Sequence, residues 1–208
     1  MNIVAITRPV TPAETAILND MYRLRARVFR GRLSWDVRCV DDMERDQFDD
    51  LDPTYILTLG ARDEVLGCAR LLPASGRTML QEVFPQLIHG GRLNAHHGMI
   101  ESSRFCVDTA RCEGRGEGSL HFGTISLFAG IVEWCLANRY HEIATATDIR
   151  FERILKRAGW PLSRLGQPVT INETVSVAGI LQAGEEIFQR LRPSGYRADI
   201  TRSTLHVA

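Results

Sequence analysis

Residues 98–138 read GMIESSRFCVDTARCEGRGEGSLHFGTISLFAGIVEWCLAN, and this stretch decides the fold. Its first part, residues 98–107, has the composition of a strand, and we predict a central position for it in a sheet. Its last part, residues 119–138, is apolar almost all round, which is typical of a buried helix rather than an amphipathic one. A strand, a glycine-bearing loop and a buried helix in this order indicate a layered α/β domain.

The segments on either side of this stretch alternate between strand and helix patterns. The predicted strands are 2–7, 54–60, 64–72, 141–147, 165–171 and 173–182, and the predicted helices are Thr11 to about Arg30, 78–89, 148–158 and 184–192. Several neighbouring strands form hairpins. The pattern therefore predicts an α/β fold, a three-layer α/β/α sandwich with a mixed central sheet.

The chain has 208 residues, a length typical of one domain, and we expect a single domain over 1–208. Residues 31–53 form a loop that is too long for a simple connection, and we expect it to be a mobile loop over a substrate. The tail after residue 193 has no clear pattern.

Basic and acidic residues number 25 each, a balance that argues against a general nucleic-acid binder. No apolar run approaches the ~20 residues of a membrane helix, so we expect no membrane insertion. The N-terminus lacks a secretory signal and the 5 cysteines form no C-x-x-C pair, which favours a cytoplasmic location. The 6 histidines are scattered, and no metal site is predicted.

The loop within residues 98–138 contains Arg111-x-x-Gly114-x-Gly116. This spacing resembles the pyrophosphate-binding loop of the GCN5-related N-acetyltransferases, in which backbone N–H groups and a helix N-terminus hold an anion. A flexible polar loop would have the same composition, and both interpretations stay open.

The strand at 98–107 carries charged residues. Alternation places Glu101, Ser103 and Phe105 on one face and Arg104 on the other. If Glu101 and Arg104 line one site, the strand needs a bulge, which we predict near Ser102–Ser103. The alternative is an ordinary buried ion pair.

Two further segments are rich in charge. Arg25 and Phe29 share one face of the first helix, and the segment that follows contains Trp35 and then eight carboxylates, at Asp36, Asp41, Asp42, Glu44, Asp46, Asp49, Asp50 and Asp52. Most of these carboxylates are expected to be solvated. The helix at 148–158 carries a basic stripe, which is either a solvated face or a docking site for an acidic partner.

Taken together, these residues resemble the acyl-homoserine-lactone synthases, the LuxI-type autoinducer synthases of quorum sensing. The resemblance rests on Arg25, Phe29, Trp35, Asp46, Asp49, Arg70 in CARLLP, Phe84, and Glu101 and Arg104 in ESSRF. The segments GRLSWDV, ESSRFCVDT, LFAGIVEW and TATDIRFERILKRAGWP look especially like the synthases linked to plasmid conjugation in rhizobia and agrobacteria. The family's fold is similar to that of the GCN5-related N-acetyltransferases.

The resemblance implies a reaction in two steps. An acyl group, here a medium-chain 3-oxoacyl group, passes from acyl carrier protein to the amine of S-adenosylmethionine. The methionine carboxylate then closes on its own γ-carbon and expels methylthioadenosine. Both substrates are consumed, and no tightly bound cofactor is expected.

The resemblance also implies roles for residues. Glu101 is the candidate base and Arg104 binds the substrate carboxylate. Arg25, Phe29, Trp35 and Asp46 contribute to the S-adenosylmethionine site, and Asp49 and Arg70 hold the long loop as a charge cluster. The candidate acyl-chain pocket comprises Met79, Phe84, Ser103, Phe105, Thr145 and Thr147, with Thr145 donating to a 3-oxo group. The candidate docking residues for the acidic carrier protein are Arg150, Arg153, Lys156 and Arg157.

Two other functions stay open at this point. An acyl-CoA-dependent N-acyltransferase of the GCN5-related type would explain the glycine loop but leave the charged and aromatic set unexplained. A catalytically silent module that binds acyl ligands would have no use for Glu101 and the whole polar set.

Overall fold

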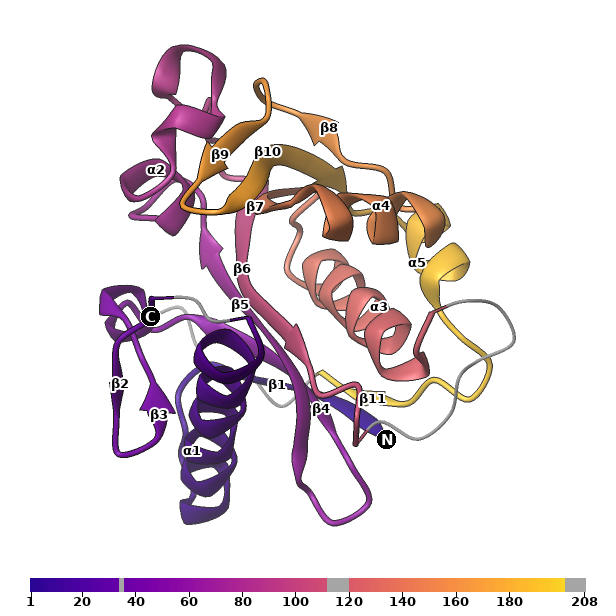
Figure 1. The fold of residues 1–208 in the computed structure, drawn as a ribbon. Helices are drawn as coiled ribbons and strands as arrows, with labels where there is room; N and C mark the ends of the chain where they lie inside the picture. The colour runs from indigo at the N-terminus through magenta and orange to yellow at the C-terminus, as the bar shows by residue number, and fades with distance from the viewer. Residues whose placement is uncertain (34–35, 112–119, 201–208) are drawn as a thin grey trace. The chain divides into compact units, whose positions relative to one another are not determined.

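The computed structural model describes residues 1–33, 36–111 and 120–200 (Figure 1). The chain divides into two compact units. Unit 1 comprises Met1–Arg70, Arg104–Ile131 and Pro193–Ala208, and unit 2 comprises Leu71–Ser103 and Val132–Arg192. Strands β5 (Val65–Pro73) and β6 (Met99–Val107) and helix α3 (Phe122–Ala137) contribute residues to both units. That residues 1–208 act as one domain stays a prediction.

Unit 1 contains a sheet with the strand order β11-β1-β4-β5-β6. Strand β1 is antiparallel to β4 and parallel to β11, so the sheet is mixed. The remaining elements are β1 (Asn2–Ile6), α1 (Pro12–Ala26), a π-helix (Arg27–Arg32), β2 (Cys39–Val40), β3 (Met43–Glu44), a 3-10 helix (Gln47–Asp50), β4 (Thr54–Leu59) and β11 (Ala198–Asp199).

Helix α1 begins where the sequence predicts. The Thr11 hydroxyl accepts a hydrogen bond from the Glu14 N–H at 3.1 Å, and the Glu14 carboxylate accepts from the Thr11 N–H at 3.0 Å. This reciprocal pair satisfies N–H groups that a helix start leaves open. The helical segment continues to Arg32, two residues beyond its predicted end at about Arg30. From Arg27 its turns widen to a π-helix in which Val28 and Phe29 are buried. Such turns are frequent at functional sites.

Two helices cover opposite faces of the sheet in unit 1 (Figure 1). Helix α1 packs Leu24 into a core with Tyr55 and Leu57 of β4. On the other face α3 comes so close that a Cβ at Gly130 would lie 2.5 Å from Ile3 Cγ2. The three layers and the mixed sheet are therefore confirmed. Most of α3 is buried as its composition predicts, but one side of the helix is half-buried, at Phe122, Ile125, Glu133 and Leu136.

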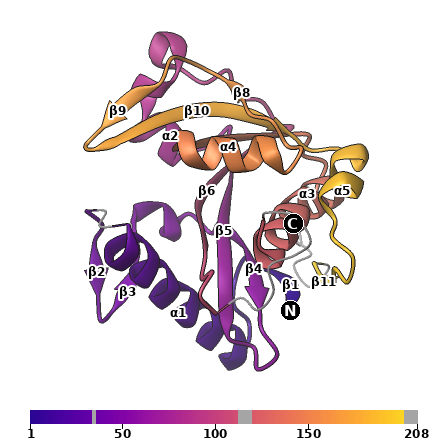
Figure 2. The ribbon, with the colours of Figure 1, turned by 45° about the vertical axis from the view of Figure 1, so that its right-hand side comes forward.

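Unit 2 contains a sheet with the strand order β5-β6-β7-β10-β8, and β9 also pairs with β10. Strand β6 is parallel to β7, whereas β7 and β10 are antiparallel. Helix α4 packs along β7 and β10 (Figure 2). The other elements are α2 (Met79–Glu82), 3-10 helices at Pro85–Leu87 and His89–Gly91, β7 (Glu142–Asp148), α4 (Ile149–Arg157), β8 (Ser163–Arg164), β9 (Val169–Ile171), β10 (Thr174–Gln182) and α5 (Glu185–Leu191).

The structure adds detail that the sequence patterns miss. The expected loop 31–53 contains the β2–β3 hairpin and a 3-10 helix, and the tail contributes β11 to the sheet of unit 1. Trp35, Gly114 and Gly116 lie outside the described residues. Within the described part of the chain, no helix is long and apolar enough to cross a membrane. The cytoplasmic location stays a prediction.

Candidate active site

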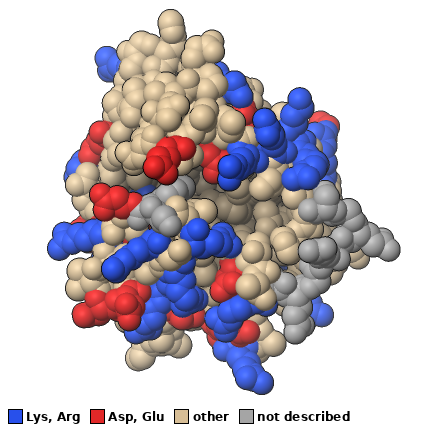
Figure 3. Space-filling view, viewed as in Figure 1, with Lys and Arg blue, Asp and Glu red and all other residues tan. Residues whose placement is uncertain are grey.

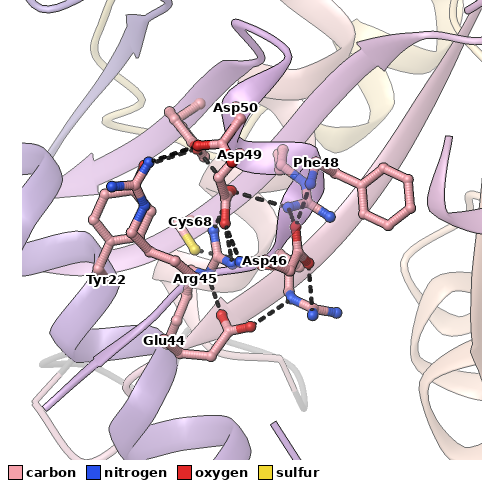
Figure 4. Close-up of polar contacts among 12 residues, drawn as sticks. Tyr22, Glu44, Arg45, Asp46, Phe48, Asp49, Asp50 and Cys68 are labelled. Atoms are coloured by element: carbon pink, nitrogen blue, oxygen red, sulfur yellow. Dashed lines mark hydrogen bonds and ion pairs between the residues drawn. The ribbon is translucent and has the colours of Figure 1, made fainter. Parts of the chain in front are cut away.

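Three arginines and three carboxylates of unit 1 form a closed ring of alternating charge (Figure 4). The helix α1, the β2–β3 hairpin with the 3-10 helix after it, and strands β5 and β6 supply its members. In ring order they are Asp49, Arg25, Glu44, Arg104, Asp46 and Arg70. We call this set the charge ring.

One half of the charge ring joins Asp49 to Glu44 through Arg25. Arg25 Nη1 and Nη2 donate to the two oxygens of Asp49 at 2.8 and 2.9 Å, which is the bidentate geometry that a guanidinium favours. Arg25 Nε donates to Glu44 Oε2 at 2.5 Å, and the other oxygen of Glu44 accepts from Arg104 Nε at 3.1 Å.

The other half joins Arg104 back to Asp49. Arg104 Nη2 lies 2.7 Å from Asp46 Oδ2. Arg70 Nη1 donates to Asp46 Oδ1 at 2.5 Å and to Asp49 Oδ1 at 2.9 Å. The three positive and three negative charges balance, which reduces the cost of burying them.

Each arginine of the charge ring also lies against an aromatic side chain. The guanidinium carbons of Arg25, Arg70 and Arg104 lie 5.3, 5.5 and 5.6 Å from ring centroids. The aromatic partners are Tyr22, Phe48 and Phe29, in that order. Cations at this distance are attracted by the aromatic face, so each guanidinium is held in plane and position.

Burial shapes the electrostatics of the charge ring. Burial alone would raise the pKa of Asp49, but Arg25 and Arg70 outweigh it and hold that pKa well below the usual range. For Arg25, Asp49 and Glu44 outweigh burial and raise its pKa. For Arg104 burial dominates, and its pKa is lowered. The side chains of Asp46 and Arg104 are 18% and 9% exposed, whereas the other four are fully buried.

Local sequence explains the position of two carboxylates. Asp46 caps the 3-10 helix by accepting from the Phe48 N–H at 2.9 Å, and Asp49 accepts from the Asp46 N–H at 2.9 Å. Asp residues at such caps satisfy open backbone donors. The cap therefore sets both carboxylates at the correct spacing for the charge ring.

The strand that carries Arg104 has an irregular backbone at that residue. Arg104 has a φ of +53°, in the left-handed region that most residues avoid. Strain of this kind is often kept at functional sites. The bulge predicted near Ser102–Ser103 stays a prediction.

Glu101 lies in unit 2 and is 1% exposed. Its Oε1 accepts from the Leu80 N–H at 2.5 Å and its Oε2 from the Met79 N–H at 3.2 Å. Both donors begin α2, which Thr78 caps. The carboxylate is therefore held in one orientation by backbone groups.

The predicted pocket residues divide between the units. In unit 1, Phe105 packs against Phe128 with 5.2 Å between the ring centroids and the ring planes tilted by 35°. In unit 2, the Thr145 hydroxyl donates to the Ser102 carbonyl at 2.8 Å. The other candidates in unit 2 are half-buried, namely Met79, Phe84, Ser103 and Thr147.

Helix α4 presents the predicted docking residues. Arg150, Arg153, Lys156 and Arg157 are all exposed, and basic side chains gather over α4 in Figure 3. Among the described residues none of the four forms an ion pair. Glu152, the acidic residue between them, is bound to Arg164 at 2.6 Å instead.

The structure adds Glu44 to the predicted set, and it assigns Arg25 to the charge ring with a fully buried guanidinium. No sequence signal separates Glu44 from the other carboxylates of this segment. The expectation that most of them are solvated is confirmed for Asp36, Asp41, Asp42, Asp50 and Asp52. Within the described residues, no group of three or more His, Cys, Asp or Glu side chains is placed to hold a metal ion.

The fold is shared with N-acyltransferases. An acyl-CoA N-acyltransferase from Pseudomonas aeruginosa has a TM-score of 0.53 at 13% identity, covering 88% of this chain and 99% of that one, which shows the fold alone. The structure of BjaI, a CoA-dependent acyl-homoserine-lactone synthase, with S-adenosylmethionine and isopentyl-CoA has a TM-score of 0.83 at 26% identity. That likeness covers 97% of this chain and 95% of BjaI. The class is thus that of α/β acyltransferases.

Sequence comparisons narrow this class. An acyl-homoserine-lactone synthase of Rhizobium radiobacter is 57% identical over 187 residues, 90% of this chain and 88% of the relative. An acyl-homoserine-lactone synthase of Agrobacterium fabrum is 50% identical over 196 residues, which cover 94% of this chain and 93% of the relative. The model of the autoinducer synthases matches residues 10–191. The chain belongs to this family, and its activity is that of an acyl-homoserine-lactone synthase, which uses S-adenosylmethionine and an acyl thioester without a tightly bound cofactor.

Proposed function

We propose that this synthase takes a medium-chain 3-oxoacyl group from acyl carrier protein, and that the exposed edge of the charge ring binds the amino-acid end of S-adenosylmethionine. One observation carries the proposal for the site. Asp46 and Arg104 are the members of the ring that reach solvent, and they are neighbours within it. A carboxylate beside a guanidinium complements the ammonium and carboxylate groups of an amino acid.

The other members of the charge ring would hold Asp46 and Arg104 in position without contacting the substrate. Glu44 and Phe29 hold the guanidinium of Arg104, and Arg70 holds the carboxylate of Asp46. Arg25 then contributes to substrate binding through Glu44 rather than by contact. Trp35 keeps its place in this proposal on the resemblance to the family.

Glu101 is the proposed base of the acyl transfer, directly or through one water. A free α-amine has a pKa near ~8, so much of it is protonated at neutral pH. Glu101 takes that proton, the amine lone pair attacks the thioester carbon, and the bond from that carbon to sulfur breaks. The carrier thiolate leaves and takes up the second proton that the nitrogen loses as the amide forms. The methionine carboxylate then attacks its own γ-carbon, and the bond from that carbon to the sulfonium breaks with its electrons on sulfur. Methylthioadenosine is released and the lactone remains.

Helix α4 supports a protein as the acyl donor. Its four cations, which form no ion pair with the described residues, lie within residues 150–157, and the first and last of these eight residues are ~10 Å apart at ~1.5 Å per residue. A row of this length matches carboxylates spaced along an acidic helix, whereas the negative charges of a CoA thioester are gathered on the three phosphate groups of its nucleotide. BjaI is a CoA-dependent synthase, so the donor needs a direct test.

Charge reversal on α4 provides that test. Arg153→Glu is expected to raise the KM for the acyl carrier protein several-fold and to leave the KM for S-adenosylmethionine unchanged. Added salt should raise the same KM in the unaltered enzyme, because exposed charges are screened beyond ~8–10 Å. Arg139→Glu, at an exposed position outside α4, is the matched control. Equal effects of the two variants, or salt-independent kinetics, would contradict the docking face.

The acyl group is expected to lie against Met79, Phe84, Ser103, Phe105, Thr145 and Thr147. Thr145 is the proposed contact for a 3-oxo group. Because its hydroxyl proton lies on the Ser102 carbonyl, the hydroxyl must turn before it donates to the substrate.

The proposed function is tested by product analysis. The purified protein is incubated with S-adenosylmethionine and with carrier-protein and CoA thioesters of the same acyl chains, with and without a 3-oxo group, and products are read by mass spectrometry. Equal amounts of methylthioadenosine and a medium-chain 3-oxoacyl lactone from the carrier thioester would support the proposal. Faster turnover of CoA thioesters would overturn the choice of donor, and acylated amine without methylthioadenosine would favour the alternative N-acyltransferase.

A further inference from the structure

We propose that Tyr22 and Tyr55 are positioning residues for S-adenosylmethionine binding, which they serve through Asp49 and the charge ring. The inference rests on the proposed substrate contact of Asp46 and Arg104. Neither tyrosine belongs to the set on which the family resemblance rests. Both side chains are buried in unit 1, at 7% and 2% exposed.

Two successive hydrogen bonds join Tyr22, Tyr55 and Asp49, and the donor of each can be assigned. The Tyr55 hydroxyl donates to Asp49 Oδ1 at 2.7 Å. A hydroxyl has one proton, so in the 3.0 Å contact between the two tyrosine oxygens Tyr22 is the donor. The chain runs from Tyr22 through Tyr55 to Asp49.

Asp49 is the point at which this chain acts on the charge ring. Its Oδ1 accepts from Arg25, Arg70 and Tyr55, and its Oδ2 accepts from Arg25 and the Asp46 N–H. Tyr55 belongs to β4, so its bond ties the loop that carries Asp49 to the sheet. Asp49 lies opposite Arg104 in the charge ring. The two are connected on one side through Arg25 and Glu44 and on the other side through Arg70 and Asp46.

Tyr22 has a second contact with the charge ring. The Arg25 guanidinium lies over its aromatic face at 5.3 Å, and Arg45, which pairs with the exposed Asp50, lies over the same side chain at 4.9 Å. A cavity of about 220 Å³ borders Tyr22, Tyr55 and Asp49. Because Asp49 borders the same cavity, loss of the Tyr55 hydroxyl would leave Asp49 Oδ1 with one donor fewer at this end of the ring.

The test compares Tyr55→Phe, Tyr22→Phe and the double variant. Tyr55→Phe is expected to raise the Kd and KM for S-adenosylmethionine about 3- to 10-fold, the range for one lost hydrogen bond. Neither kcat nor the KM for the acyl donor should change. Tyr22→Phe should give a smaller rise because its aromatic face stays under Arg25. The double variant should equal Tyr55→Phe, since Tyr22 acts through Tyr55.

Thr54→Val is the matched control. Thr54 lies on β4 beside Tyr55, and its hydroxyl contacts the Thr7 hydroxyl at 2.7 Å without taking part in the hydrogen bonds from Tyr22 to Asp49. The substitution should lower the melting temperature without changing the Kd for S-adenosylmethionine. Additive effects of the two tyrosine variants, or a loss of thermal stability with unchanged Kd, would overturn the positioning role. If Asp46→Asn leaves the Kd for S-adenosylmethionine unchanged, the proposed substrate site at Asp46 and Arg104 is wrong. This result distinguishes failure of the substrate site from failure of the positioning role of the tyrosines.

Discussion

Asp49→Asn is expected to lower the free energy of unfolding by about 3–5 kcal/mol, the cost of breaking a buried ion pair by removing one partner. The variant keeps the shape of the side chain but leaves Arg25 and Arg70 buried with too little negative charge. For a chain of this length the melting temperature should fall by roughly 6–20 °C. Thermal denaturation followed by circular dichroism measures this change.

The neighbouring residue supplies a matched control. Asp50 is exposed and pairs with Arg45, which is also exposed, so Asp50→Asn should leave the melting temperature unchanged. If both variants have the same stability as the unaltered protein, the charge ring does not hold the loop. The same result with an unchanged KM for S-adenosylmethionine would also remove its proposed role in binding.

The effect of Asp49→Asn should depend on pH. The pKa of Asp49 in the folded chain lies below its ordinary value of 3.8. A carboxyl group of this kind stabilises the folded state above its unfolded-state pKa, and the contribution declines as the pH falls toward the folded-state pKa. The difference in stability between the unaltered protein and the variant should be constant from pH 5 to 7, as follows from this linkage, and should shrink below about pH 4.

Glu101→Gln is expected to lower kcat by about 100- to 10,000-fold, the usual contribution of a general base. The remaining activity should rise with pH up to about 8, since the amine then loses its proton to solvent. Methylthioadenosine release, followed by mass spectrometry from pH 6.5 to 8.5, measures both effects.

Folding and binding need to be separated from this catalytic effect. The glutamine amide would face the Met79 or Leu80 N–H, so the melting temperature and the Kd for S-adenosylmethionine are measured on the same preparation. Glu82→Gln is the control. Glu82 is an exposed carboxylate of α2, the helix whose first N–H groups bind Glu101, and it pairs with Arg77, so its replacement should leave kcat unchanged. A folded Glu101→Gln protein with full kcat at pH 7 would exclude Glu101 as the base.

Local patterns carried most of the fold prediction. The Thr11 cap, the apolar helix at 119–138 and the hairpin strands depend on contacts between residues near in sequence, and such patterns repeat reliably. The short strands β8 and β11 were not predicted, because two residues are too few to show an alternation pattern. The π-helical turns after Ala26 escaped because the same side chains fit an α-helix.

Strand and helix periodicity and residue chemistry are local properties, and they were enough to predict the layered α/β fold and to select Glu101 and Arg104 as charged residues of a central strand. Asp46, Asp49 and Arg70 were selected by the resemblance to the synthase family. Which of these charges pair with one another depends on the tertiary structure. Glu44 is buried between Arg25 and Arg104, while nearby Asp41 and Asp42 are exposed. The reason is that a charge survives burial only where folding brings its partners from distant segments. No local pattern records that meeting, and it alone closes the charge ring.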